Sequence, residues 1–305
     1  MTPIRFGFTM PRGAVDPAHR ATYLADVRRG LELVRGHFDS AWIIDHLQWA
    51  EADSLEAWTA LTYMAALYPD FHYGHAVLCQ GFRNPALLAK MGATLQFMTG
   101  GRFILGVGAG WKEDEYRAYG YPFPTAGTRV AQLDETLQIV KALWRDPQAT
   151  VRGQHYEVVE AWCEPKPDPV PPIMVGGTKP RMLRVVARHA DWWNVSWAPL
   201  AAYREQVAEC ERACTAIGRD PATLRRTWFG GCFCAPTEAA LAAVLKGRTF
   251  TGDTFAFAGT PAQIVDQMRP FIDLGVDYFI LGCGGFPNLT TLELLASEVL
   301  PQLNR

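Results

Sequence analysis

Short apolar runs alternate with segments in which apolar residues recur every three or four positions along the 305-residue chain. Short runs bounded by Gly, Asn or Pro are typical of buried strands, and the 3.6-residue period is typical of helices that cover them. We therefore expect a strand within 101–111 and seven others, at 4–10, 38–44, 71–79, 173–175, 192–196, 226–234 and 278–282.

Helix boundary signals separate these strands. Asn84-Pro85 supplies an N-cap and a first-turn proline, Gly100 follows as a C-terminal glycine, and Asp53 with Glu56 resembles a capping box. The predicted helices span 19–35, 53–67, 84–100, 130–144, 180–189, 200–217 and 261–274, and another begins at Thr290. The acidic segment 112–116 also indicates the start of a helix. A strand followed by a helix, eight times over, predicts an α/β fold of the (β/α)₈ TIM-barrel type, with residues 1–305 as a single domain.

Residues 147–171 interrupt this alternation. Gly153, Tyr156 and Val158 indicate a short extended segment, and the prolines between 165 and 172 are incompatible with a helix. We expect an insertion in the barrel here. In such a barrel the functional site lies at the C-terminal ends of the strands. That rule selects Met10, Asp45, His46, Cys79, Gly81, Gly108, Ala109, Gly110, Trp111, Gly176, Gly177, Thr178, Ser196, Trp197 and Cys283.

Two glycine-rich turns stand out among these positions. Residues 101–111 read as a buried strand that breaks at Gly106, Gly108 and Gly110, and residues 172–180 contain Gly176-Gly177-Thr178-Lys179-Pro180. Glycines allow a sharp bend and a close approach of the backbone, and free amides at a helix start hold a phosphate. Neither turn is a Walker A or Rossmann motif. The alternative for the second turn is an ordinary glycine-rich loop.

Asp45-His46 directly follows a predicted strand and could combine a hydrogen-bonding carboxylate with a general base. A structural role is the alternative, and the position at a strand end favours catalysis. His75 lies within a strand and is expected to be a satisfied core or wall histidine. Several tryptophans could form a flat apolar wall, with buried packing as the alternative: Trp42, Trp49, Trp111, Trp193 and Trp197.

Composition narrows the possible partners. The formal charge of −2 gives no electrostatic reason to bind nucleic acid, and no apolar run is long enough to span a bilayer, so we expect a cytoplasmic protein.

The seven cysteines are scattered without a CxxC pair, and Cys210, Cys214, Cys232 and Cys234 are predicted to be core residues. No HExxH or GxSxG motif is present, and we expect no metal site.

The order of several motifs resembles the bacterial luciferase-like superfamily. The resemblance rests on Asp45-His46, on the segments 82–90 and 99–111, on Tyr119 to Pro124, on Pro171 to Gly177 and on His189 to Asn194, with further matches at 259–261 and 275–282. It covers nearly the whole chain in the right order. The resemblance implies a TIM barrel that uses FMN or the deazaflavin coenzyme F420 and commonly forms a homodimer through helices flanking the second and third strands.

The resemblance also implies residue roles. A cis peptide near Ala76-Val77 would form a bulge under the cofactor ring, Gly108 and Gly176 to Thr178 would hold the phosphate, His46 would exchange a proton with the substrate, and Asp45 would orient the ring. The implied cofactor site comprises Ala76, Val77, Cys79, Gly108, Ala109, Gly110, Trp111, Gly176, Gly177 and Thr178. Some relatives carry a proton-donating glutamate where this chain has Trp111, which indicates a more apolar substrate face.

Three functions follow from these expectations. The first is an oxidoreductase that exchanges a hydride between F420 and a small organic substrate. The second is an FMN-dependent monooxygenase that uses oxygen and a partner reductase, and the third is a noncatalytic flavin-binding barrel. Arg83, Lys112 and Lys179 could serve the anionic tail of F420. The sequence does not identify the substrate.

Overall fold

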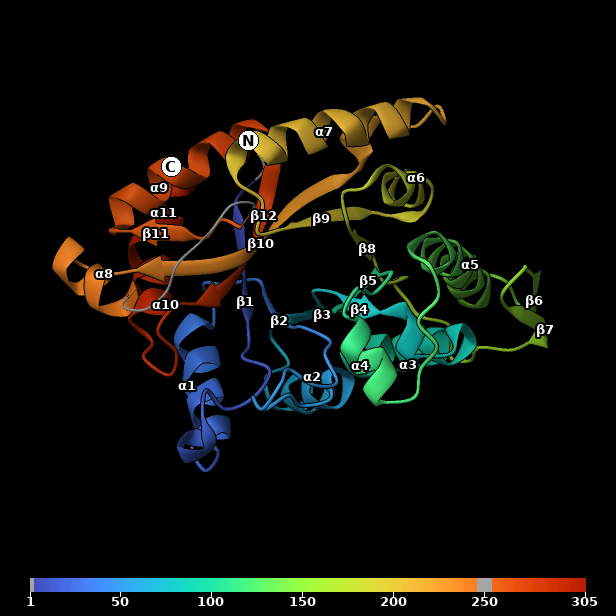
Figure 1. Cartoon of the computed structure of the whole chain (residues 1–305), viewed down its shortest axis with the longest axis horizontal. Coiled ribbons are helices and arrows are strands. Elements are labelled where there is room, and N and C mark those ends of the chain that lie inside the picture. The colour runs from blue at the N-terminus through green and yellow to red at the C-terminus, as the bar shows by residue number, and fades with distance from the viewer. Residues whose placement is uncertain (1–2, 246–253) are drawn as a thin grey trace.

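The computed structural model describes residues 3–245 and 254–305, and within them eight parallel strands close into a barrel (Figure 1). The closure is direct, because Phe8 pairs with Ala41 on one side and Leu281 on the other. The predicted TIM barrel is confirmed. Its strands, in order around the ring, are β1 (Arg5–Thr9), β2 (Ser40–Ile43), β3 (His72–His75), β5 (Phe103–Gly108), β8 (Ile173–Gly176), β9 (Trp192–Ser196), β10 (Arg225–Cys234) and β12 (Val276–Cys283).

Helices surround the barrel and mostly begin where their caps predict. Asn84 accepts hydrogen bonds from Ala86 N and Leu87 N, and Gly100 follows the helix at φ +60°. The helices are α1 (Tyr23–Val34), α2 (Ala57–Leu67), α3 (Pro85–Met98), α4 (Glu113–Ala118), α5 (Ala126–Arg145), α6 (Pro180–His189), α7 (Leu200–Thr215), α8 (Glu238–Leu245), α9 (Pro261–Asp273), α10 (Thr290–Leu294) and α11 (Leu300–Leu303).

The predicted capping box at Asp53 is wrong. Glu56 itself caps α2, and its carboxylate accepts hydrogen bonds from Trp58 N and Thr59 N. Asp53 instead receives the guanidinium of Arg20. The helix therefore starts at the last acidic residue of the loop, because that carboxylate reaches the free amides of the first turn.

Alternate strand residues build two layers of core. Side chains that point inward fill the barrel, with Trp42, Ile104, Met174 and Tyr278 among them, so the barrel is packed and has no pore. Outward-pointing side chains such as Phe8, Val107 and Leu281 pack against the helices. Cys210, Cys214, Cys232 and Cys234 are buried in the outer layer, as predicted. In the described parts of the chain, no helix is both long and apolar enough to cross a membrane.

The predicted insertion is confirmed as a hairpin of β6 (Ala149–Arg152) and β7 (Glu157–Ala161), which lies beyond α5 at one side of the barrel (Figure 1). The Glu135 carboxylate of α5 fastens its turn by accepting the amides of Gln154, His155 and Tyr156. A Cβ at Gly153 would lie 2.3 Å from that carboxylate, which explains the glycine. Two short elements were not predicted, α8 and the strand β11 (Phe257–Gly259), which pairs with β10.

His75 is a core residue but is not satisfied. Its ring is fully buried, stacks on Trp58 at 5.2 Å, and meets no hydrogen-bond partner at either nitrogen among the described residues. Burial lowers the pKa of His75 to about 3, because the charged form loses its hydration.

This buried ring makes stability depend on pH. Between the folded pKa of about 3 and the usual value of 6.5, the unfolded chain binds the extra proton, so stability rises with pH and is lost as pH falls. We expect the free energy of unfolding to drop by about 1–2 kcal/mol from pH 6.5 to pH 5 through this residue. Urea unfolding at both pH values should show a smaller drop for His75→Phe, which keeps the stacked ring. Equal drops in both proteins would contradict this assignment.

Candidate functional site

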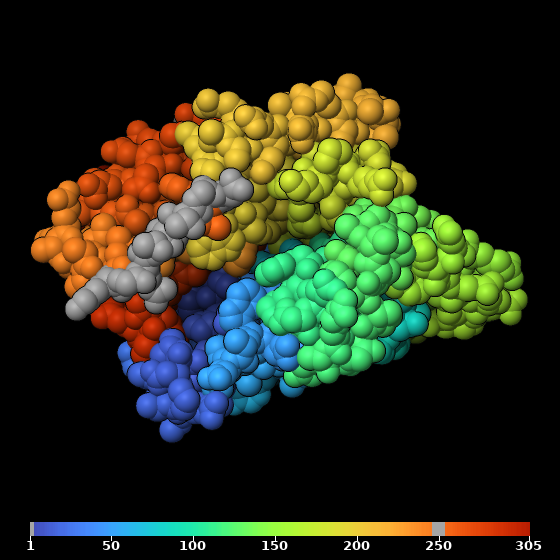
Figure 2. Space-filling model, in the orientation of Figure 1, coloured from blue at the N-terminus to red at the C-terminus, as the bar shows by residue number. Residues whose placement is uncertain are grey.

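The C-terminal ends of the strands and the loops that follow them form one face of the barrel. Figure 2 shows this face hollowed between the green segment that contains α4 and the yellow segment that leads into α7. These segments follow β5 and β9, so the hollow lies where the barrel fold places its functional site.

The third strand breaks at this face. β3 ends at His75, the Ala76-Val77 peptide bond is cis, and β4 (Leu78–Cys79) continues along β5. The cis bond is the one that the family resemblance implies. Val77 is half-buried and packs on the apolar core inside the barrel. The break therefore places a small apolar surface at the mouth.

The two glycine turns meet beside that surface. β5 and β8 are neighbours, which places Gly108 next to Gly176. A Cβ would lie 2.9 Å from a Val77 methyl group if placed on Gly108, and 3.1 Å if placed on Gly176. Side chains are therefore excluded between the turns and Val77. The structure brings Val77, Gly108 and Gly176 together, as predicted.

The second turn leads into an uncapped helix. Gly177 has φ +136°, which favours glycine, and its amide donates to the Asn194 carbonyl. Lys179 occupies the N-cap position of α6 without a side-chain hydrogen bond, and Pro180 begins the helix. Amides in the first turn of such a helix have no partner within it and favour an anion. Thr178, half-buried, lies between this helix start and Gly177.

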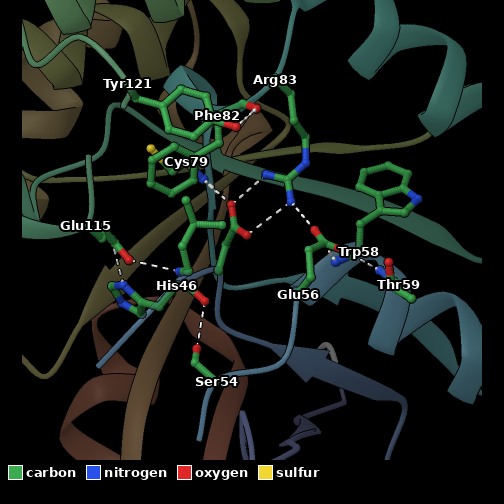
Figure 3. A network of polar contacts seen from close by, with 12 residues as sticks. His46, Ser54, Glu56, Trp58, Thr59, Cys79, Phe82, Arg83, Glu115 and Tyr121 are labelled. Atoms are coloured by element: carbon green, nitrogen blue, oxygen red, sulfur yellow. Dashed lines mark hydrogen bonds and ion pairs between the residues drawn. The ribbon is translucent and has the colours of Figure 1, made fainter. Parts of the chain in front are cut away.

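His46 lies at the rim of the mouth, in the loop after β2. Its Nδ1 lies 3.0 Å from Oε1 of Glu115, and its carbonyl accepts a hydrogen bond from Ser54 (Figure 3). Trp49 contacts the imidazole edge to face, with ring centres 4.8 Å apart. No described residue bonds Nε2. His46 therefore has one nitrogen held and the other free to meet a ligand.

Glu115 is a candidate site residue that we did not predict from the sequence. It belongs to α4, is 2% exposed, and also accepts the Leu47 amide at 2.9 Å. One carboxylate thus holds both the imidazole and the backbone of the same loop. The available signal was the run Glu113-Asp114-Glu115 at the helix start. The run does not reveal which carboxylate faces β2, because the contact spans 69 positions.

The Asp45 carboxylate and the His46 ring have different partners. Asp45 is buried against β4 and Arg83, while His46 lies at the rim. Asp45 accepts hydrogen bonds from Cys79 N at 2.8 Å and from two nitrogens of Arg83 at 2.7 and 3.1 Å. Its side chain is 1% exposed. Asp45 therefore fastens the loop after β2 to β4, and its predicted role in orienting a cofactor stays a prediction.

Arg83 completes this network by also binding Glu56, the cap of α2 (Figure 3). Burial acts to lower the pKa of Arg83, but the two carboxylates outweigh it and the pKa is raised. Burial opposes ionisation of Glu56, yet hydrogen bonds from Thr59 and Trp58, with help from Arg83, lower its pKa to about 2. Arg83 is thus paired with two carboxylates of the protein, and its role toward a cofactor tail stays a prediction.

Cys79 and Tyr116 pack against the first glycine turn. Sγ of Cys79 lies 2.7 Å from the Tyr116 hydroxyl, and burial raises the pKa of the thiol to about 12, which leaves it neutral. Gly110, at φ +75°, packs on the same pair, and a Cβ there would lie 2.2 Å from the Tyr116 oxygen. The side chains of Cys79 and Tyr116 therefore hold the turn that contains Ala109 and Gly110 in place.

The tryptophans divide into core and rim. Trp42 and Trp193 are fully buried, and the Trp193 indole donates to Gly177 O at 2.8 Å. Trp111 is 66% exposed and lies edge to face with both His46 and Trp49. Trp197 packs on Phe229 at the strand ends. The rim around His46 is aromatic, as the wall hypothesis requires. Throughout the described residues, no group of three or more His, Cys, Asp or Glu is arranged to hold a metal.

Comparison with known proteins agrees with this geometry. The chain is 24% identical over 300 residues to the F420-dependent glucose-6-phosphate dehydrogenase of Amycolatopsis mediterranei (strain U-32), which covers 87% of this chain and 90% of that protein. Its fold matches an F420-dependent secondary alcohol dehydrogenase (TM-score 0.83, 19% identity, 99% of each chain) and a long-chain alkane monooxygenase (TM-score 0.82, 16% identity, 99% of this chain and 91% of that one). The sequence model described as luciferase-like monooxygenase matches residues 5–251. The chain belongs to the luciferase-like monooxygenase family.

Proposed function

We propose that this protein is an oxidoreductase that transfers a hydride between coenzyme F420 and a small organic substrate. The observation that carries the proposal is His46, held by Glu115 at the mouth of the barrel with its second nitrogen free. The glycine turns lie across the same mouth. The F420-dependent dehydrogenase of Amycolatopsis supports this choice, since it resembles the chain over most of its length.

The residues at the mouth fit a cofactor with a flat ring and a phosphate. The ring finds an apolar support in Ala76 and half-buried Val77, and the glycine turns leave no side chain in between. The phosphate finds the uncapped start of α6, with Thr178 beside it. Gly108, Gly176, Gly177 and Thr178 would hold the phosphate, while Ala76, Val77, Cys79, Ala109, Gly110 and Trp111 would border the ring.

His46 supplies the proton chemistry of the proposed reaction. When bound, F420 supplies a hydride donor and acceptor, and the substrate carbon that gains or loses a hydride needs a proton moved at its oxygen or nitrogen. Nε2 of His46 would carry that proton, and Glu115 at Nδ1 would hold the ring in position. Trp49 and Trp111 would limit water at the rim.

A second candidate is an FMN-dependent monooxygenase that receives reduced flavin from a partner reductase. The aromatic rim around His46 supports it, since it suits an apolar substrate, and the matching alkane monooxygenase has the same fold. A noncatalytic flavin-binding barrel is the third. A bound cofactor needs no proton carrier for storage, so the held His46 argues against that function.

Titrating the apoprotein with F420 and with FMN, oxidised and anaerobically reduced, tests the proposal. Tight binding of F420 alone supports it. Tight binding of FMN, with oxygen consumed once substrate and reductase are supplied, would establish the monooxygenase instead. Binding of neither cofactor would reject both.

Glu115→Gln should separate the positioning role of Glu115 from cofactor binding. The amide preserves the side-chain shape but removes the charge beside Nδ1 of His46. We expect kcat to fall roughly 10–100-fold, as for other supporting partners of a working histidine, with KM and the Kd of F420 nearly unchanged. Steady-state kinetics and fluorescence titration measure these quantities. An unchanged kcat would show that Glu115 only fastens the loop.

We also propose that the protein is a homodimer and a single domain over residues 1–305, of which 1–2 and 246–253 lie outside the described residues. The support for a dimer is an exposed apolar surface on α2 and α3, and sedimentation velocity tests it. The exposed side chains are Tyr63, Leu67, Leu87, Phe97 and Met98.

A further inference from the structure

Arg12 is a cation at the mouth that has no acidic partner among the described residues. Arg12 follows β1, and its backbone is fixed because the Leu55 amide donates to its carbonyl at 2.8 Å. The Nε atom is buried without a hydrogen-bond partner, and no ion pair joins Arg12 to another described residue. Asp53, whose backbone packs on the neighbouring Gly13, is occupied by Arg20.

Arg12 and His46 lie close together because both contact the ring of Trp49. The guanidinium carbon lies 4.6 Å from the centre of the Trp49 ring, and Trp49 contacts His46 on another side. Lys112 also approaches Trp49, at 5.3 Å, but its ammonium is paired with Asp114. Arg12 is therefore the unpaired cation of this rim within the described chain. Burial lowers the pKa of Arg12, and the guanidinium stays charged because an arginine side chain does not lose its proton in proteins.

The position of Arg12 separates it from the phosphate of the cofactor. β8, which carries Gly176 and leads to Thr178, is the fourth strand from β1 in either direction around the ring. A group held at the glycine turns therefore lies across the mouth from Arg12. His46 and Trp49 lie on the side of Arg12, which is the side where the substrate reacts in the proposed function.

We propose that Arg12 binds an oxyanion group of the substrate, so that the substrates of this enzyme are small anionic molecules, carboxylates or phosphate esters. That the bound oxyanion belongs to a substrate rests on the proposed function. The oxyanion-binding site itself does not. A partly desolvated guanidinium is suited to the task, because its planar fork matches a carboxylate or phosphate and is weakly hydrated. Stacking on Trp49 fixes that fork while leaving its outer nitrogens available.

The test uses fluorinated probes and the cofactor-free protein. Binding of 4-fluorobenzoate, 4-fluorophenyl phosphate and neutral 4-fluorobenzamide is measured from their ¹⁹F line widths. In the wild type we expect either oxyanion, or both, to bind more tightly than the amide. Arg12→Met should weaken oxyanion binding roughly ten- to hundredfold and leave the amide unchanged. Comparison of 4-fluorobenzoate with 4-fluorophenyl phosphate shows whether the site prefers a carboxylate or a phosphate.

Two further variants keep the test decisive. Arg117→Met removes an equal charge from the exposed face of α4 and should change nothing. Arg12→Lys keeps the charge without the fork and should retain part of the preference, with circular dichroism confirming the fold. The proposal is overturned if the oxyanions bind no better than the amide, including no binding of any probe, or if their preference survives Arg12→Met. Failure of F420 to bind would reject the proposed function and leave this result standing.

Discussion

His46→Ala is expected to lower turnover by roughly 10²–10⁴-fold while leaving the affinity for F420 nearly unchanged. The His46 imidazole is held at one nitrogen by Glu115 and has no partner at the other among the described residues. Its removal takes away proton transfer but no part of the glycine turns, which lie on other strands. Stopped-flow measurement of F420 reduction, with a fluorescence titration for binding, separates the two effects.

His19 offers a matched control, because it is an exposed histidine paired with Asp16 in the loop before α1. His19→Ala should keep full activity. If His46→Ala turned over at the wild-type rate, the assignment of His46 as the proton carrier would be wrong. If the wild type bound cofactor but turned over none of a broad panel of alcohols, imines and activated alkenes, a storage function would be favoured.

Arg83→Met is expected to destabilise the protein by about 3–5 kcal/mol, the usual cost of leaving a buried charge without its partner. Asp45 would keep its bond to Cys79 N but lose both contacts to the guanidinium. The same change frees Glu56 at the start of α2. Because Asp45 joins the loop of His46 to β4, we expect activity to fall as well. Chemical denaturation gives the change in the free energy of unfolding.

Arg117→Met is again the control, since its ion pair with Glu113 is exposed and should contribute less than about 1 kcal/mol. The double variant Asp45→Asn/Arg83→Met should be less destabilised than the sum of its two single variants, because no unpaired charge remains at the buried position 45. A loss for Arg83→Met no larger than that of the control would show that this network does not stabilise the mouth.

The barrel could be predicted because its determinants are local. Strand and helix periods, the Asn84 cap and the glycine after α3 each act within a few residues. The prediction failed where one local signal competed with another, as at Asp53, which resembles a cap but binds Arg20. It also failed for the short elements β11 and α8, which contain too few residues to show a period.

The sequence predicted where the site residues lie, but it did not predict which side chains contact one another there. The strand-end rule selected His46, Gly108 and Gly176, because the fold alone brings those positions to the mouth. The partners of His46 and Asp45 depend on side-chain direction and on residues far along the chain, namely Glu115 and Arg83. The unpaired state of Arg12 could not be predicted either, since it depends on Arg20 occupying Asp53.

A crystal structure of the protein with F420 bound would show directly where the cofactor lies. We expect the phosphate at Gly108 and at Gly176 to Thr178, the deazaflavin ring on Ala76 and Val77, and its reacting edge facing Nε2 of His46. A ring bound elsewhere, or a phosphate away from both glycine turns, would contradict this prediction.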